Sequence, residues 1–256
     1  MATFKSSDGL DISYRVIGDG DPVVLLHGWM VGGAVWDRVT DALTGAGLKL
    51  YIPDQRGAGE SAKPERGYDI EQYVADAIAL ADAAGLERFA LVGHSMGGQI
   101  AQVVAAELGD RVSRMVLLCP VPAAGMPLPD EAAALFRNSG GNTEAQTTIL
   151  NMACKQLDED ALAFCLATAA TVSTPCVEQA FDAWTGENFA DRLGRVTAKT
   201  TVYGTDDPFL TPEILNAAVV ELIANADFHH QPGPGHYPQV ETPADTGAKL
   251  AELLKN

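Results

Sequence analysis

A serine between two glycines is the first candidate for chemistry in this sequence. Residues 93–97 read Gly-His-Ser-Met-Gly, between an apolar run and a segment with helical character. A serine that projects from such a turn needs small residues two positions away on either side, because strand and helix crowd together there. We interpret Ser95 as a nucleophile, although an isolated match to this short pattern is equally typical of a structural turn.

A serine hydroxyl becomes a strong nucleophile only when a histidine removes its proton and a carboxylate holds that histidine. The downstream sequence contains both groups. Asp206 and Asp207 directly follow an apolar run, and His236 lies in a loop rich in glycine and proline after the next expected strand. The chain order is therefore serine, aspartate, histidine, with Asp207 as the first candidate for the acid and Asp206 as the alternative.

The elements that would position these residues alternate along the chain. Short apolar runs rich in β-branched residues are separated by stretches of helical character, which is typical of an α/β fold with a parallel sheet covered on both faces. A hairpin with Asp8-Gly9 at its turn is expected before them. The expected strands are 23–28, 49–54, 88–94, 114–120 and 199–207, and the expected helices are 34–43, 70–84, 96–108, 212–223 and 243–254.

Residues 121–195 interrupt this alternation. The segment follows Pro120, begins with the loop Val-Pro-Ala-Ala-Gly-Met-Pro, residues 121–127, and continues with helix-length patterns and no convincing strand. We expect a helical insertion that covers the site. Most of its apolar side chains must pack among its own helices, but a few can line a substrate cavity; the candidates are Phe136, Met152, Phe181 and Trp184.

Composition excludes several classes of partner. The chain has 256 residues and a formal net charge of −17 with only 17 Lys and Arg, so it lacks the cations that binding of nucleic acid or an anionic membrane requires. No apolar run approaches the roughly 18 residues of a membrane span, and no signal peptide is recognisable at the start. We expect a cytoplasmic protein. Its four cysteines lack metal-ligand spacing and are expected to be free thiols, with one disulfide among the last three as the alternative.

At this point the sequence resembles the α/β-hydrolase fold family. Five segments carry the resemblance, in the order and at the spacings usual for that family, and they span nearly all of the chain outside 121–195. They are LHGWMVGGAVWD, DQRGAGES, GHSMGG, YGTDDPFL and GHYPQVETP. The resemblance implies a mostly parallel eight-stranded sheet flanked by helices, with a core of residues 1–120 and 196–256 and a helical cap, 121–195, inserted after strand 6.

The resemblance also implies roles for individual residues. Ser95 would be the nucleophile and His236 the base. The acid would be Asp207, which stands third after the strand-end Gly204. The backbone N–H groups of Trp29 and Met96 would form the oxyanion hole.

Other residues in these segments have competing interpretations. The side chains of Trp29 and Met30 either form the floor of the acyl pocket or close the core. His27 and His94 are expected to be packed residues, with the His27 ring holding its loop, and Arg56 is expected to stabilise a loop rather than to bind a substrate carboxylate. No cofactor is expected. A metal site is not expected either, because adjacent strand residues such as His229 and His230 point to opposite faces.

The expected reaction is hydrolysis of carboxylic esters through an acyl-enzyme on Ser95. The serine excludes the chemistry of dehalogenases and epoxide hydrolases, which use an aspartate at this position. Small to medium, largely apolar esters are the expected substrates, with lactones included. Alternatives with the same three residues are a cofactor-free haloperoxidase or perhydrolase and a carbon–carbon bond hydrolase, and a non-catalytic receptor for a small ligand is an alternative of another class. The oligomeric state is not predicted.

Overall fold

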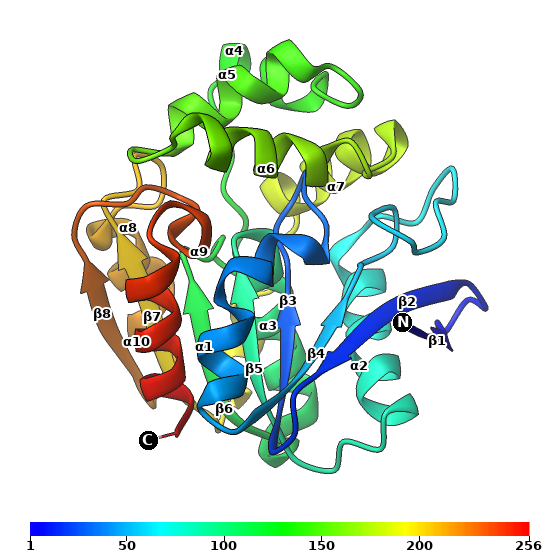
Figure 1. Ribbon diagram of the computed structural model, residues 1–256, viewed down its shortest axis with the longest axis vertical. Coiled ribbons are helices and arrows are strands. Elements are labelled where there is room, and N and C mark those ends of the chain that lie inside the picture. Colours follow the sequence, from blue (N-terminus) through cyan, green and yellow to red (C-terminus); the bar gives the residue numbers. More distant parts are fainter. Residues whose placement is uncertain (256) are drawn as a thin grey trace.

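An eight-stranded sheet forms the centre of the protein, which we describe from a computed structural model for residues 1–255 (Figure 1). The strand order is β1-β2-β4-β3-β5-β6-β7-β8. The first two strands are antiparallel to their neighbours, and all later pairs are parallel, which confirms the expected fold. The strands are β1 (Ala2–Lys5), β2 (Asp11–Ile17), β3 (Asp21–Leu26), β4 (Leu48–Pro53), β5 (Phe89–His94), β6 (Val112–Leu118), β7 (Lys199–Thr205) and β8 (Ala226–Gln231).

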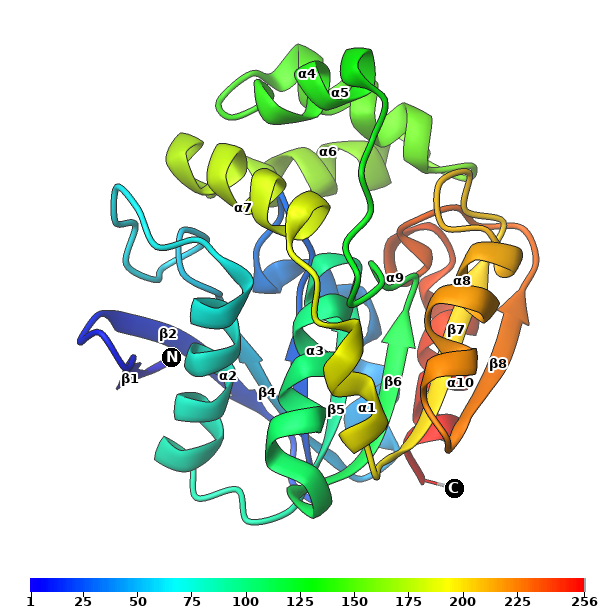
Figure 2. The ribbon, with the colours of Figure 1, turned by 180° about the vertical axis from the view of Figure 1, so that it is seen from behind.

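Helices cover both faces of this sheet. Figure 1 shows α1 and α10 on one face, and Figure 2 shows α2, α3 and α8 on the other. The central strand β5 is buried along its whole length, as expected for a strand covered on both sides. The helices outside the segment between β6 and β7 are α1 (Thr40–Gly45), α2 (Ile70–Ala83), α3 (Met96–Leu108), α8 (Pro212–Ala218), α9 (Pro238–Glu241) and α10 (Pro243–Lys255). The 3₁₀ turns are η1 (Gly33–Val39), η2 (Gly109–Arg111), η3 (Ala190–Arg195) and η4 (Val220–Leu222).

Two of the expected helices are shorter than the sequence pattern indicates. The stretch expected at 34–43 begins as the 3₁₀ turn η1 and becomes α-helical only at Thr40. The stretch expected at 212–223 is α-helical to Ala218 and then tightens into η4. In both places the apolar residues keep a helical spacing while the backbone changes between α-helix and 3₁₀ helix. The spacing of apolar residues does not distinguish these two helix types.

Four α-helices between β6 and β7 lie together above the carboxyl ends of the strands (Figure 1). They are α4 (Asp130–Arg137), α5 (Thr143–Ala153), α6 (Glu159–Ala169) and α7 (Thr174–Gly186). The chain then returns along α3, where Arg192 forms ion pairs with Glu71 and Glu107. The covering helices therefore end at Gly186, before the expected boundary at residue 195; we call residues 121–186 the cap.

The four cysteines are all free, as expected, and all four are buried. No single helix of residues 1–255 is long and apolar enough to cross a bilayer. In the same described residues, α6 and α7, which are bent by 99° relative to each other, would together be long and apolar enough by length and composition alone.

Candidate active site

The turn that carries Ser95 is a crowded one. Ser95 lies between β5 and α3 with φ 55° and ψ −122°, a conformation that a residue with a side chain rarely adopts. A Cβ atom on Gly93 would lie 2.3 Å from the Gly97 carbonyl oxygen, and one on Gly97 would lie 2.4 Å from the Leu26 oxygen. Only glycine fits at either position, so the two glycines allow strand and helix to meet at Ser95.

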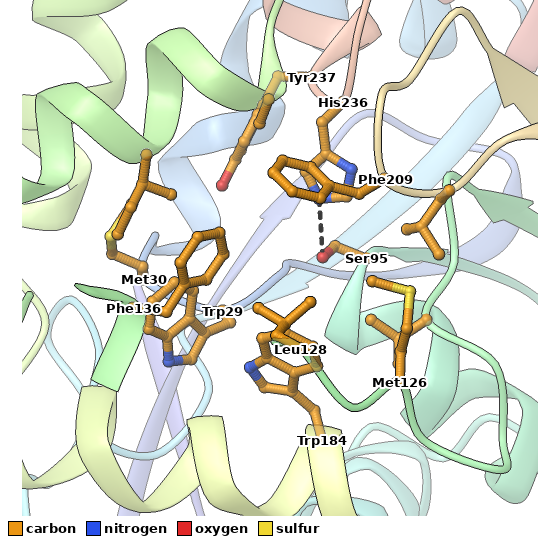
Figure 3. Close-up of a pocket in the computed structure, with 14 residues that line it drawn as sticks. Trp29, Met30, Ser95, Met126, Leu128, Phe136, Trp184, Phe209, His236 and Tyr237 are labelled. Atoms are coloured by element: carbon orange, nitrogen blue, oxygen red, sulfur yellow. Dashed lines mark hydrogen bonds between the residues drawn. The ribbon is translucent and has the colours of Figure 1, made fainter. Parts of the chain in front are cut away.

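Ser95, His236 and Asp207 form one chain of hydrogen bonds. His236 Nε2 lies 2.9 Å from Ser95 Oγ (Figure 3), and His236 Nδ1 lies 2.5 Å from Asp207 Oδ2. The other carboxylate oxygen accepts the N–H groups of Phe209, at 2.8 Å, and Leu210, at 3.2 Å. A carboxylate held in this way favours the tautomer with the proton on Nδ1, which leaves Nε2 free to accept the serine proton.

The electrostatics of Asp207 favour its charged form. The residue is only 2% exposed, and burial alone would raise its pKa. The adjacent His236, followed by the two backbone N–H groups, outweighs burial, so the pKa of Asp207 lies below its usual value. The imidazole therefore faces a fixed negative charge.

The neighbouring Asp206 points elsewhere. Its two carboxylate oxygens bind His230 Nε2 at 3.0 Å and the Gly233 N–H at 2.9 Å. Since Asp206 lies beside Asp207 in the chain, only the fold separates the two: the structure brings Asp207 to His236 and uses Asp206 to hold the loop that leads to it.

The loop after β3 is held beside Ser95 by His27. Its Nδ1 lies 2.8 Å from the Gly28 oxygen, and its Nε2 accepts the Gln55 N–H at 2.9 Å. Burial lowers the pKa of His27, which keeps the ring neutral and able to donate on one side and accept on the other. The ring thus holds the loop, as the sequence indicates.

Two backbone N–H groups next to Ser95 bind no acceptor in the part of the chain that the structure describes. One is the N–H of Trp29, in the His27 loop, and the other is the N–H of Met96, the first residue of α3. Neither donates a hydrogen bond within residues 1–255. The loop passes so close that a Cβ atom on Gly28 would lie 2.9 Å from Ser95 Cβ. Unpartnered N–H groups beside a nucleophile are what an oxyanion hole requires.

His94 lies behind the histidine of the site. Its Nε2 donates to the His236 carbonyl oxygen at 2.8 Å, and its ring contacts Tyr237 at a centroid distance of 4.8 Å. Burial, followed by the nearby His236, lowers the pKa of His94 to about 3. His94 is therefore a neutral donor that supports the backbone of the His236 loop.

Arg56 has no access to a substrate. Its side chain is fully buried, and it binds both carboxylate oxygens of Asp76, at 2.6 and 2.8 Å, as well as those of Asp8. The guanidinium thus connects the turn of the first hairpin to α2, in agreement with the structural interpretation of its sequence segment.

An apolar pocket opens above Ser95, between the sheet edge and the cap (Figure 3). The Trp29 ring stacks on Phe136 of α4 at 5.6 Å, so the loop beside Ser95 and the cap share one wall. Histidine apart, the lining contains no residue that carries charge at neutral pH. The lining residues are Trp29, Met30, Ser95, Val121, Met126, Leu128, Phe136, Ile149, Ala153, Trp184, Phe209, Leu210, His236 and Tyr237.

Two of the cap residues expected to line this pocket do not. The prediction for Met152 is wrong: this residue is 41% exposed on the outer side of α5. Ile149 and Ala153 of the same helix face the pocket instead. Phe181 packs behind the wall, with its ring 6.0 Å from Trp29 and 5.2 Å from Trp184. The structure places Phe136, Trp184, Trp29 and Met30 at the pocket as expected.

Sequence reasoning missed several lining residues that lie next to residues it identified. Phe209 and Leu210 follow Asp207, and Tyr237 follows His236. Their position beside the reacting groups was the available signal. Leu128, in the loop before α4, offered no such signal.

One group of potential metal donors lies at the site. Sγ of Cys119, a carboxylate oxygen of Asp207 and a ring nitrogen of His236 are within 4.8 Å of one another. The last two already bind each other, and the Cys119 thiol lies 3.3 Å from Thr205 Oγ1. Burial also raises the pKa of this thiol, which disfavours the thiolate that a metal needs. We assign no metal to these residues.

Comparison with known proteins found a family model, relatives in sequence and solved structures that are similar to this chain. A family model described as "Alpha/beta hydrolase family" matches residues 23–249. A non-heme chloroperoxidase from Streptomyces lividans is 31% identical, over 95% of this chain and 97% of that protein. An esterase structure from Exiguobacterium antarcticum has a TM-score of 0.92 and 23% identity over 100% of this chain and 99% of that one. A structure described as Est816, an N-acyl homoserine lactone degrading enzyme, has a TM-score of 0.85 and 28% identity over 98% and 99%.

Proposed function

Because this chain belongs to the alpha/beta hydrolase family, we propose that it is a serine hydrolase that cleaves small to medium, largely apolar carboxylic esters, lactones included. The observation that carries this proposal is the chain of hydrogen bonds from Asp207 through His236 to Ser95, at the floor of an apolar pocket. A nucleophile, a base and a group that orients the base are the parts that acyl transfer requires.

In the proposed mechanism Ser95 Oγ attacks the ester carbonyl carbon while His236 Nε2 takes the hydroxyl proton. Asp207 remains ionised and stabilises the imidazolium. The tetrahedral oxyanion accepts the N–H groups of Trp29 and Met96, and the loss of one such donor commonly costs about 10²- to 10³-fold in rate. His236 then protonates the leaving alcohol. Water, activated by the same histidine, hydrolyses the acyl-enzyme.

The pocket supports the substrate class. Trp29, Phe136 and Trp184 present aromatic surface, and the absence of a charged partner in the lining disfavours an ionised acyl group, whose desolvation would go uncompensated. Lactones are included because Est816, which is similar over nearly the whole chain, is described as a lactone degrading enzyme.

Perhydrolysis is a second candidate, favoured by the similarity to a non-heme chloroperoxidase. Hydrogen peroxide would then replace water as the acceptor, so that the acyl-enzyme yields a peracid and free Ser95. The balance between the two reactions is measured by the peracid and carboxylic acid formed from one ester at increasing peroxide concentration. Peracid that stays a trace at every concentration would eliminate this candidate.

The test of the main proposal is turnover of a p-nitrophenyl ester series and a lactone series, with fluorophosphonate labelling of Ser95. Ser95→Ala and His236→Ala are each expected to lose activity by about 10⁴-fold or more. The receptor alternative predicts no turnover, or only slow cleavage, by the wild type. A carbon–carbon bond hydrolase would instead hydrolyse a carbon–carbon bond of its substrate faster than it hydrolyses esters.

The acid is tested by a matched pair of neighbouring substitutions. Asp207→Asn is expected to lower kcat by about 10⁴-fold, because the amide favours the wrong imidazole tautomer. Asp206→Asn should have a far smaller effect, since the Asp206 carboxylate binds His230 and the Gly233 N–H rather than His236. A larger loss from Asp206→Asn would show that the acid has been misassigned.

A further inference from the structure

Glu241, the last residue of α9, accepts four backbone N–H groups on one carboxylate. Oε2 accepts those of Lys155 and Gln156, each at 2.8 Å, and that of Gly235 at 2.9 Å. Oε1 accepts the Tyr237 N–H at 2.9 Å. Hydrogen bonds to an ionised acceptor are about twice as strong as neutral ones, so this carboxylate is a strong local anchor.

The four donors come from two segments with different tasks. Lys155 and Gln156 follow α5, the cap helix whose Ile149 and Ala153 line the pocket. Gly235 and Tyr237 stand on either side of His236. One side chain thus joins the cap to both flanks of the histidine.

The same two segments also touch directly. The His236 N–H donates to the Ala153 carbonyl oxygen at 2.9 Å. A Cβ atom on Gly235 would lie 2.4 Å from that oxygen and 2.8 Å from Cys154 Cα, so only glycine permits this approach. The end of α5 cannot move away from the sheet without removing bonds from Glu241 and from His236 itself.

We propose, on the basis of the function proposed above, that Glu241 is a positioning residue that makes the geometry of His236 depend on the docked cap. When the end of α5 is in place, the carboxylate holds both flanks of His236 and the imidazole keeps its alignment with Ser95. When the end of α5 lifts, Glu241 loses the N–H groups of Lys155 and Gln156 that fix it, and the His236 backbone N–H loses the Ala153 oxygen. The imidazole then loses its alignment, and hydrolysis stops until the cap returns.

The chain offers a matched control for this inference. Glu187, directly after α7, also uses a carboxylate to accept a backbone N–H, that of Ile70 at the start of α2, at 3.1 Å. It ties the other end of the cap to the core without contacting the His236 loop or the pocket. Removal of Glu187 therefore tests the loss of a cap–core contact alone.

The experiment compares Glu241→Ala, Glu241→Gln and Glu187→Ala with the wild type on p-nitrophenyl acetate. In Glu241→Ala, kcat is expected to fall about 10- to 100-fold, the cost of a misplaced catalytic group, while KM changes by less than about threefold. Glu241→Gln should be intermediate, since an amide retains one accepting oxygen. In Glu187→Ala, kcat should stay within about threefold of the wild type even if the melting temperature falls.

Amide hydrogen exchange provides a readout that does not depend on turnover. In Glu241→Ala, exchange of the Lys155–Gln156 and Gly235–Tyr237 amides should accelerate together, by about tenfold or more. Gly235→Ala, which forces the loop from the cap while Glu241 stays intact, should reproduce both effects if Glu241→Ala does not fold.

Three outcomes would overturn the inference. They are an unchanged kcat in folded Glu241→Ala, an equal loss of kcat in Glu187→Ala, and faster exchange in the cap amides alone. A wild type that neither hydrolyses esters nor reacts with fluorophosphonate would refute the proposed function instead.

Discussion

Ser95 combines a strained backbone with a reactive side chain. Its positive φ and strongly negative ψ are typical of glycine, and a residue held there by its surroundings costs of order 1–3 kcal/mol. The strain projects the hydroxyl toward His236 rather than into the crowded turn, so we interpret it as the cost of presenting the nucleophile.

This strain can be measured by comparing two inactive variants. Both Ser95→Ala and Ser95→Gly lack the hydroxyl, but only glycine adopts the native φ without strain. Ser95→Gly is expected to have a free energy of unfolding about 1 kcal/mol higher than Ser95→Ala, even after the greater flexibility of glycine in the unfolded chain. Urea unfolding monitored by tryptophan fluorescence provides the measurement. A Ser95→Gly variant no more stable than Ser95→Ala would show that the turn is relaxed.

At the level of single residues, the sequence identified groups whose chemistry is explicit in their type. Ser95 and His236 each stand in a segment with few alternatives. Residue type alone did not separate Asp207 from Asp206; the spacing known from the family did. Glu241 was missed because an acid near the end of a helix is common, and only the fold brings Lys155 and Gln156 to it.

At the level of elements, the cap shows how one step along a helix decides a role. Ile149 and Ala153 face the pocket, and Met152 faces solvent, because successive residues are separated by about 100° around the helix axis. The sequence predicted the sheet strands and a helical insertion from their apolar patterns. It did not predict which side of each cap helix faces the sheet, since that depends on packing with segments far away in the chain.

The cap wall makes a testable prediction about acyl-chain length. Phe136→Ala removes the ring stacked on Trp29 and enlarges the pocket. The ratio of kcat/KM for p-nitrophenyl octanoate to that for the acetate is expected to rise by about tenfold, since each buried methylene contributes about 0.8 kcal/mol. Phe164→Ala, on α6 beside Arg38 and outside the pocket lining, is the control and should leave the ratio unchanged. Equal ratios in wild type and Phe136→Ala would place the acyl chain elsewhere.

For the molecule as a whole, two buried neutral histidines make stability depend on pH. The pKa of His94 is lowered to about 3 in the folded protein, against about 6.5 in the unfolded chain. At a pH between these two values His94 is uncharged in the folded protein and protonated in the unfolded chain. Its contribution is present in full above pH 6.5 and is lost as pH falls toward 3. His27 has the same sign, because burial lowers its pKa as well.

The His94 contribution is isolated by comparing the wild type with His94→Gln, which cannot titrate. Between pH 7 and pH 5 the free energy of unfolding of the wild type should fall by about 2 kcal/mol more than that of the variant. Urea unfolding at the two pH values measures the difference. Equal falls would mean that His94 is protonated in the folded state.

The burial of all four thiols has a practical consequence for watching the cap at work. A cysteine introduced at an exposed position would be the one that a maleimide dye reaches readily. Met152, on the outer side of α5, is such a position. A fluorophore there, paired with a second label on the sheet side, would record whether the cap lifts and, if it does, whether each lifting accompanies one turnover.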